Sequence, residues 1–124
     1  MYRNSLTEMR DLEIEEIMDI LDLATQFKAN VKGHTEIASG LLMASLFLEP
    51  STRTRGSFEA AMKRLGGDTI TTTDFKSSSM EKGETLNDSI RIWGNYCDLI
   101  VLRHQESGAP RVAANISSVP IMNA

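Results

Sequence analysis

The hydrophobic positions along the chain follow two spacings, one typical of amphipathic helices and one typical of buried strands. Residues 13–30 carry apolar side chains three or four positions apart with charged side chains between them, which predicts an amphipathic helix. We expect this helix to end near Asn30 to Gly33, because asparagine and glycine readily adopt the left-handed backbone that terminates helices. Residues 41–48 form a continuous apolar run that is too short for a typical helix, so they favour a strand buried on both faces.

A turn and a helix follow this first strand, and the same order then recurs. Glu49-Pro50 ends the apolar run, and residues 52–65 return to helical spacing. Ser51 is suited to the N-cap of that helix, and Gly66-Gly67 to its end. The remaining predicted elements are strands at residues 68–73, 99–102 and 119–122 and helices at residues 85–96 and 109–116. Short strands alternating with helices predict an α/β fold, a parallel sheet of about four strands flanked by helices with right-handed crossovers.

Size and charge restrict the classes of function that the chain can serve. Its 124 residues, 41% hydrophobic and 24% charged, are typical of one globular domain. Thirteen basic against seventeen acidic side chains give a net charge of −4, so no overall basic field attracts nucleic acid or an anionic membrane. No apolar run reaches the ~18–20 residues that span a bilayer, and the N-terminus lacks a signal-peptide core. The single cysteine, Cys97, is interpreted as a core residue of a cytoplasmic protein.

The first of three polar clusters, at residues 51–55, directly follows the first predicted strand and opens the next helix. A helix N-terminus presents unpaired N–H groups and the positive end of the helix dipole, which favour a bound phosphate. Serine and threonine hydroxyls add donors, and a guanidinium group can hold two phosphate oxygens at once. The cluster therefore predicts a phosphate site. An ordinary serine cap followed by solvent-facing arginines is the alternative.

Two further polar clusters follow later predicted strands. Residues 77–84 place serines beside Lys82 and a glycine, which suits a loop that closes over an anion and equally suits a solvated loop. Arg103-His104 comes directly after the strand at 99–102. Because ligands of parallel sheets bind at the carboxyl ends of the strands, this pair is expected at the same edge as the first cluster. His34 is assigned no role.

Several of these segments resemble one enzyme family. The carbamoyl-phosphate signature of the aspartate and ornithine transcarbamylases is similar to three blocks here: FLEPSTRTR at 47–55, SFE at 57–59 and RLG at 64–66. The aspartate branch of the family, rather than the ornithine branch, is similar to two later blocks: SMEKGET at 79–85 and DSIR at 88–91. The same family fits VLRH at 101–104 and VPIMNA at 119–124, so the resemblance covers essentially the whole chain.

The resemblance implies a reaction and a set of residues that serve it. In that family the amine of L-aspartate attacks the carbonyl carbon of carbamoyl phosphate, giving N-carbamoyl-L-aspartate and phosphate in pyrimidine synthesis, with no metal or organic cofactor. The implied ligands of carbamoyl phosphate are Ser51, Thr52, Arg53, Thr54 and Arg103. Three of them, Arg53, Thr54 and Arg103, are implied to be catalytic, with Thr54 and Arg103 also facing the carbonyl oxygen that gains negative charge.

The resemblance also implies partners. The family works as trimers with shared sites, so Lys82 and a serine of its loop, Ser79 in preference to Ser78, are expected to reach the site of a neighbouring subunit and contact phosphate and aspartate. A regulatory or other pyrimidine-pathway partner is a further expectation. Glu49 resembles a residue that helps to link the two domains of the enzyme when it closes.

The domain assignment leaves two alternatives open. We expect residues 1–124 to form the carbamoyl-phosphate-binding domain, with the aspartate-binding domain absent from the chain, and the 124 residues alone to be inactive. The first alternative is an ornithine-type transcarbamylase, because most residues that choose the second substrate belong to the other domain. The second is a non-catalytic anion-binding or assembly module, because a fold does not guarantee a function.

Overall fold

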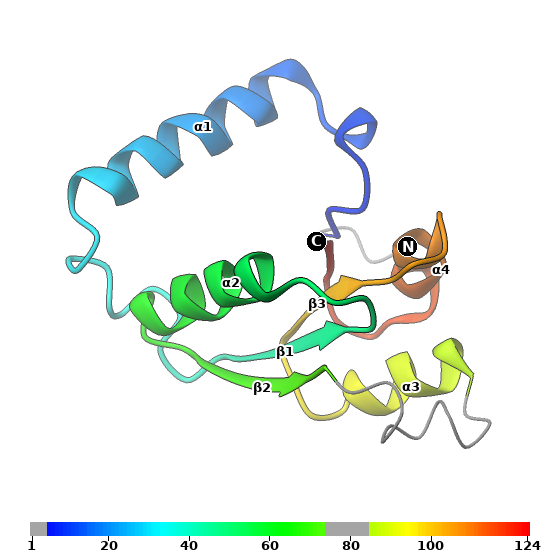
Figure 1. Ribbon diagram of the computed structural model, residues 1–124. Helices are drawn as coiled ribbons and strands as arrows, with labels where there is room; N and C mark the ends of the chain where they lie inside the picture. The colour runs from blue at the N-terminus through cyan, green and yellow to red at the C-terminus, as the bar shows by residue number, and fades with distance from the viewer. Residues whose placement is uncertain (1–4, 74–84) are drawn as a thin grey trace.

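The computed structural model describes residues 5–73 and 85–124 and is built around one parallel sheet (Figure 1). Its strands are β1 (Leu42–Phe47), β2 (Asp68–Thr72), β3 (Leu99–Arg103) and β4 (Ile121–Asn123). They lie in the order β2-β1-β3-β4, with every neighbouring pair parallel. The helices are α1 (Ile14–Ala29), α2 (Thr52–Arg64), α3 (Leu86–Trp93) and α4 (Ala109–Ile116), with a short 3-10 helix η1 (Met9–Asp11) before α1. The predicted α/β fold with a parallel sheet of four strands is confirmed.

The sheet is covered on both faces because successive side chains of a strand point to opposite sides. In β1, Met43 and Phe47 pack with Met62 of α2, whereas Ala44 and Leu46 pack in a second cluster with α3 and α4. Figure 1 shows α2 and α3 on opposite sides of the sheet. Strand β1 is thus buried on both faces, as its continuous apolar run predicted. Cys97 also lies in the core, where burial raises the pKa of its thiol.

Helix α2 begins and ends where the sequence predicted. Ser51 is the N-cap residue, although its side chain makes no capping hydrogen bond; its backbone carbonyl accepts from Arg55 N–H at 3.0 Å. At the other end Gly66 has a φ of +90°, a left-handed conformation that favours glycine. A Cβ at this position would lie 1.7 Å from the carbonyl oxygen of Thr35, so both backbone angle and space require glycine.

One predicted boundary is right for a different physical reason from the one expected, and two are wrong. Helix α1 ends at Ala29 without a left-handed residue: Asn30 has φ −142°, and Gly33 instead leaves room for the Asn30 side chain, which a Cβ would meet at 1.9 Å. Helix α3 ends at Trp93 rather than at Tyr96, since the last residues form a tighter turn. Strand β4 begins after Pro120, which has no N–H to donate to a sheet.

Helix α1 is amphipathic as predicted, yet none of its residues is buried in the described part of the chain. Figure 1 shows it standing apart from the sheet. Its apolar side chains Ile14, Met18 and Leu21 are exposed. No helix in the described part of the chain is both long and apolar enough to cross a membrane.

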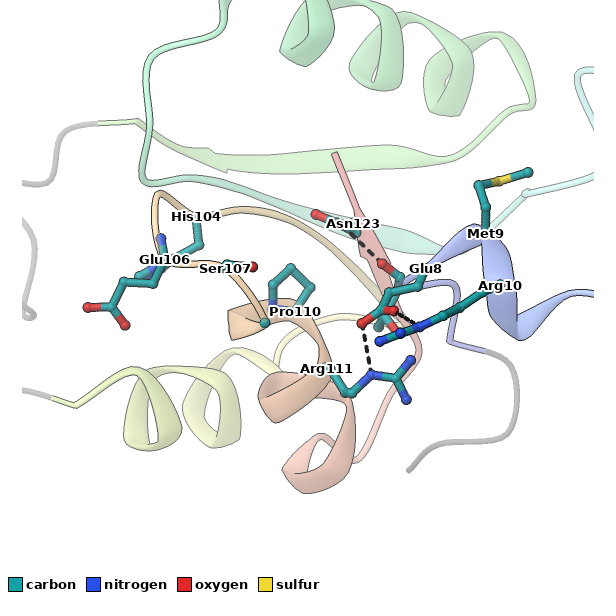
Figure 2. Close-up of a pocket in the computed structure, with 11 residues that line it drawn as sticks. Glu8, Met9, Arg10, His104, Glu106, Ser107, Pro110, Arg111 and Asn123 are labelled. Atoms are coloured by element: carbon teal, nitrogen blue, oxygen red, sulfur yellow. Dashed lines mark hydrogen bonds and ion pairs between the residues drawn. The ribbon is translucent and has the colours of Figure 1, made fainter.

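The N-terminal segment runs along the β4 edge of the sheet and is held there by backbone hydrogen bonds and by ion pairs. Leu6 exchanges backbone hydrogen bonds with the β4 region, donating to Ile121 at 2.8 Å and accepting from Asn123 at 2.9 Å. Arg111 of α4 reaches Glu8 at 3.0 Å and Asp11 at 2.8 Å, and Figure 2 shows the Glu8 contact. These contacts lower the pKa of both carboxyls and raise the pKa of Arg111.

We predict that Gly66→Ala lowers the free energy of unfolding by about 1–3 kcal/mol, because alanine is strained at this backbone angle and collides with Thr35. The matched control is Gly56→Ala within α2, where a Cβ meets nothing within 4 Å; it should stabilise by up to about 1 kcal/mol. Urea unfolding of both variants checks this, and equal stabilities would contradict it.

We predict that Arg111→Gln lowers the thermal midpoint at neutral pH and flattens its fall in acid. Arg111 depresses the pKa values of Glu8 and Asp11 below their ordinary values of 4.5 and 3.8. The stability that the two ion pairs contribute is therefore fully present above the ordinary pKa values, and it is lost as the pH falls through the depressed pKa values. Thermal melts across this pH range provide the measurement. Arg91→Gln, which removes only a 3.7 Å contact with Asp88, is the control and should change neither property.

Candidate functional site

The centre of the sheet brings together two polar segments that are distant in sequence. Phe47 of β1 is in register with Arg103 of β3, and Leu48 N–H donates to the Arg103 carbonyl at 2.9 Å. In the strand order, β2 follows β1 in one direction from the centre of the sheet, and β4 follows β3 in the opposite direction. Such a switch point is where open α/β sheets bind ligands, beyond the carboxyl ends of the strands.

A small cavity of about 200 Å³ lies at this edge, where α2 begins. Its walls come from the end of β1, the start of α2 and the residue after β2, namely Phe47, Glu49, Pro50, Ser51, Thr52, Arg55 and Thr73. Because Ser51 does not cap the helix with its side chain, its hydroxyl is available to a ligand. The unpaired N–H groups of the first helical turn and the helix dipole favour an anion here.

The first polar cluster is only partly gathered around the small cavity. Ser51 and Thr52 line it, as expected for phosphate ligands, whereas Arg53 and Thr54 are not among its lining residues. Arg53 is exposed, and the Thr54 carbonyl accepts a hydrogen bond from the Ser57 hydroxyl at 2.7 Å. Arg55, to which the resemblance assigned no role, lines the cavity instead. The ligand roles of Arg53 and Thr54 therefore stay predictions.

Arg103 is half-buried and faces a carboxylate of the same edge. Its Nε lies 3.3 Å from Oε2 of Glu49, a lining residue of the small cavity. That Nε is buried and has no hydrogen-bond partner among the described residues, so the contact with Glu49 is electrostatic. A bound anion and Glu49 would thus compete for the same guanidinium group.

A large cavity of about 520 Å³ lies on the other side of β3 and has different chemistry (Figure 2). His104 lines it and accepts a hydrogen bond from the backbone N–H of Glu106 through Nδ1, at 3.0 Å. Arg111 also lines it, but Glu8 and Asp11 already balance its charge. The small cavity is the candidate anion site because residues of the 51–55 cluster line it. Ser79 and Lys82, with the alternative Ser78, lie outside the described residues.

Comparison with known proteins identifies the family of the chain. The model of one protein family, described as "Aspartate/ornithine carbamoyltransferase, carbamoyl-P binding domain", matches residues 4–124. The chain belongs to the aspartate/ornithine carbamoyltransferase family. The resemblance noted in the sequence is confirmed, and within the family the chain corresponds to the carbamoyl-phosphate-binding domain.

Its similar relatives in this family are catalytic subunits of aspartate carbamoyltransferase. The subunit of Methanocaldococcus jannaschii is 53% identical over 121 residues, which are 96% of this chain and 40% of that protein; the Archaeoglobus fulgidus subunit is 51% identical with the same coverage. The solved M. jannaschii structure has a TM-score of 0.91 at 52% identity, covering 98% of this chain and 41% of that one. The chain thus spans about 40% of the length of the curated relatives that it matches.

A more distant structure carries a ligand. Aspartate transcarbamoylase from Trypanosoma cruzi, solved in complex with carbamoyl phosphate, is 36% identical with a TM-score of 0.86, covering 99% of this chain and 40% of that chain. At 36% identity, the similarity between the two chains supports a shared family as well as a shared fold.

We predict that Glu49→Gln strengthens the binding of inorganic phosphate by about twofold to fivefold, because it removes the carboxylate that holds Arg103 at 3.3 Å. Calorimetric titration at constant ionic strength measures this. Glu59→Gln is the matched control, since its carboxylate accepts the Thr71 hydroxyl at 2.6 Å and does not line the small cavity. Weaker binding by Glu49→Gln would contradict the competition between Glu49 and an anion.

Proposed function

We propose that this chain is the carbamoyl-phosphate-binding part of an aspartate carbamoyltransferase, which transfers the carbamoyl group of carbamoyl phosphate to L-aspartate in pyrimidine synthesis. The observation that carries the proposal is the small cavity at the β1/β3 switch point, lined by Ser51 and Thr52 at the start of α2. The M. jannaschii and A. fulgidus relatives, 53% and 51% identical to this chain, are aspartate carbamoyltransferase catalytic subunits, which supports aspartate rather than ornithine as the acceptor.

The phosphate group would be held by the first turn of α2. Backbone N–H groups and the helix dipole provide attraction that does not depend on any one side chain. The hydroxyls of Ser51 and Thr52, which line the small cavity, and the exposed Arg53 guanidinium would add directional hydrogen bonds. Aspartate transcarbamoylase of T. cruzi has been solved in complex with carbamoyl phosphate, and in a second structure with carbamoyl phosphate and aspartate together, which supports this pair of substrates.

Catalysis would rest on donors placed where charge develops. The amine nitrogen of aspartate forms a bond to the carbonyl carbon and releases a proton, and the carbon–oxygen bond to phosphate breaks with its electron pair leaving on phosphate. Thr54 and Arg103 would stabilise the negative carbonyl oxygen of the tetrahedral intermediate, where loss of one such donor typically costs ~10²–10³ in rate. Arg103 would first have to leave Glu49.

The complete site would be shared between subunits of a trimer. In this proposal Ser79 and Lys82 reach the phosphate and the aspartate carboxylates of a neighbouring subunit, and a regulatory subunit or another pyrimidine-pathway enzyme is a further partner. The protein would work in the cytoplasm, which its single unpaired cysteine, Cys97, fits.

We predict that a polypeptide of these 124 residues binds a bisubstrate phosphonate analogue of carbamoyl phosphate and aspartate, and that Arg53→Ala abolishes this binding. The reason is that Arg53 supplies the phosphate with a charge-assisted contact at the start of α2. Arg64→Ala, which removes an exposed arginine from the far end of the same helix, is the matched control in the calorimetric titration.

The same polypeptide should produce no measurable carbamoyl aspartate, because it spans about 40% of the catalytic relatives and positioning of both reactants supplies much of the rate. Failure to bind the analogue, or unchanged binding by Arg53→Ala, would contradict the proposed phosphate site. Clear turnover would contradict the proposal that the reaction also requires the aspartate-binding domain.

A further inference from the structure

Arg55 is the one cationic side chain among the described residues that line the small cavity. It is half-buried, and its backbone N–H donates to the Ser51 carbonyl at 3.0 Å. Residues four apart in a helix lie on the same face, so Arg55 stands directly above Ser51 on the side of α2 that borders the cavity. Two residues correspond to about 200° of helical rotation, so Arg53 points to the other side and is exposed.

The charge of Arg55 is not balanced by the described residues around it. Glu49 is the one carboxylate among the described lining residues, and it lies 3.3 Å from Arg103. Glu59, one turn further along α2, accepts a hydrogen bond from the Thr71 hydroxyl at 2.6 Å. Within the described ranges, no ion pair joins Arg55 to an acidic side chain. The cavity therefore combines a free guanidinium with hydroxyl groups and a helix N-terminus.

The volume of the cavity suits a small anion at Arg55. At about 200 Å³ it is smaller than the ~300–1,000 Å³ typical of pockets for drug-sized ligands. A small oxyanion such as the phosphoryl end of a substrate fits this volume. A planar guanidinium is well suited to such an anion because it donates two parallel hydrogen bonds to two of its oxygens.

We propose that Arg55 is a second guanidinium ligand of the phosphate, approaching from the β2 side while Arg53 approaches from the solvent side. This rests on the proposed function, since it adds a binding residue to the same carbamoyl-phosphate site. The phosphoryl group would lie at the N-terminus of α2, with Arg55 reaching it from the small cavity and Arg53 reaching it from the exposed side of the first turn.

The test is calorimetric titration of the purified chain with inorganic phosphate and with carbamoyl phosphate at constant ionic strength. Arg55→Ala should weaken both by about tenfold or more, as expected for the loss of a charge-assisted contact. Arg55→Lys should recover part of the affinity, because lysine keeps the charge and loses the two-pronged geometry. Arg64→Ala should stay within about twofold of the unmodified chain, and thermal melts should show the same midpoint for all three variants.

The outcomes separate this inference from the proposed function. If the unmodified chain binds neither probe, the phosphate site itself fails, and the role of Arg55 fails with it. If the unmodified chain binds and Arg53→Ala loses affinity while Arg55→Ala does not, only the role of Arg55 is overturned. A loss in Arg55→Ala that comes with a lower thermal midpoint and is not relieved by Arg55→Lys would show a packing role and would also overturn it.

Discussion

Parallel pairing of β1 with β3 at the middle of the sheet is the constraint on which the site depends. It places the segment after β1 beside the segment after β3, with Leu48 N–H bonded to the Arg103 carbonyl. Only this pairing brings Glu49 within reach of Arg103. Because β1 is buried on both faces, a shift of one residue in its register would exchange the side chains facing α2 with those facing α3 and α4. Core packing thus fixes the geometry of the polar edge.

Much of the fold could be predicted because its signals are local. The apolar run in β1, the glycine at the end of α2 and the alternation of strands with helices each depend on neighbouring residues. The carboxyl-edge rule then located two of the polar segments, at 51–55 and at Arg103-His104. The errors were also local: Gly33 provides space rather than a left-handed turn, and Pro120 delays β4.

Contacts that join distant segments could not be predicted in this way. Arg111 reaches back to Glu8 and Asp11 across almost the whole chain, and Glu49 meets Arg103 only once the sheet has formed. Which arginine of the first cluster faces the cavity depends on where α2 starts, since two residues turn a side chain by about 200°. The motif indicated Arg53, and the lining of the small cavity adds Arg55.

The most direct test of the account is to map phosphate binding onto the backbone amides of the isotopically labelled chain by nuclear magnetic resonance. The largest shifts should occur at residues 51–55 and at Arg103, on the two sides of the β1/β3 junction. Shifts centred on the large cavity, at Arg10, Gly108 and Arg111, with residues 51–55 unchanged, would contradict it.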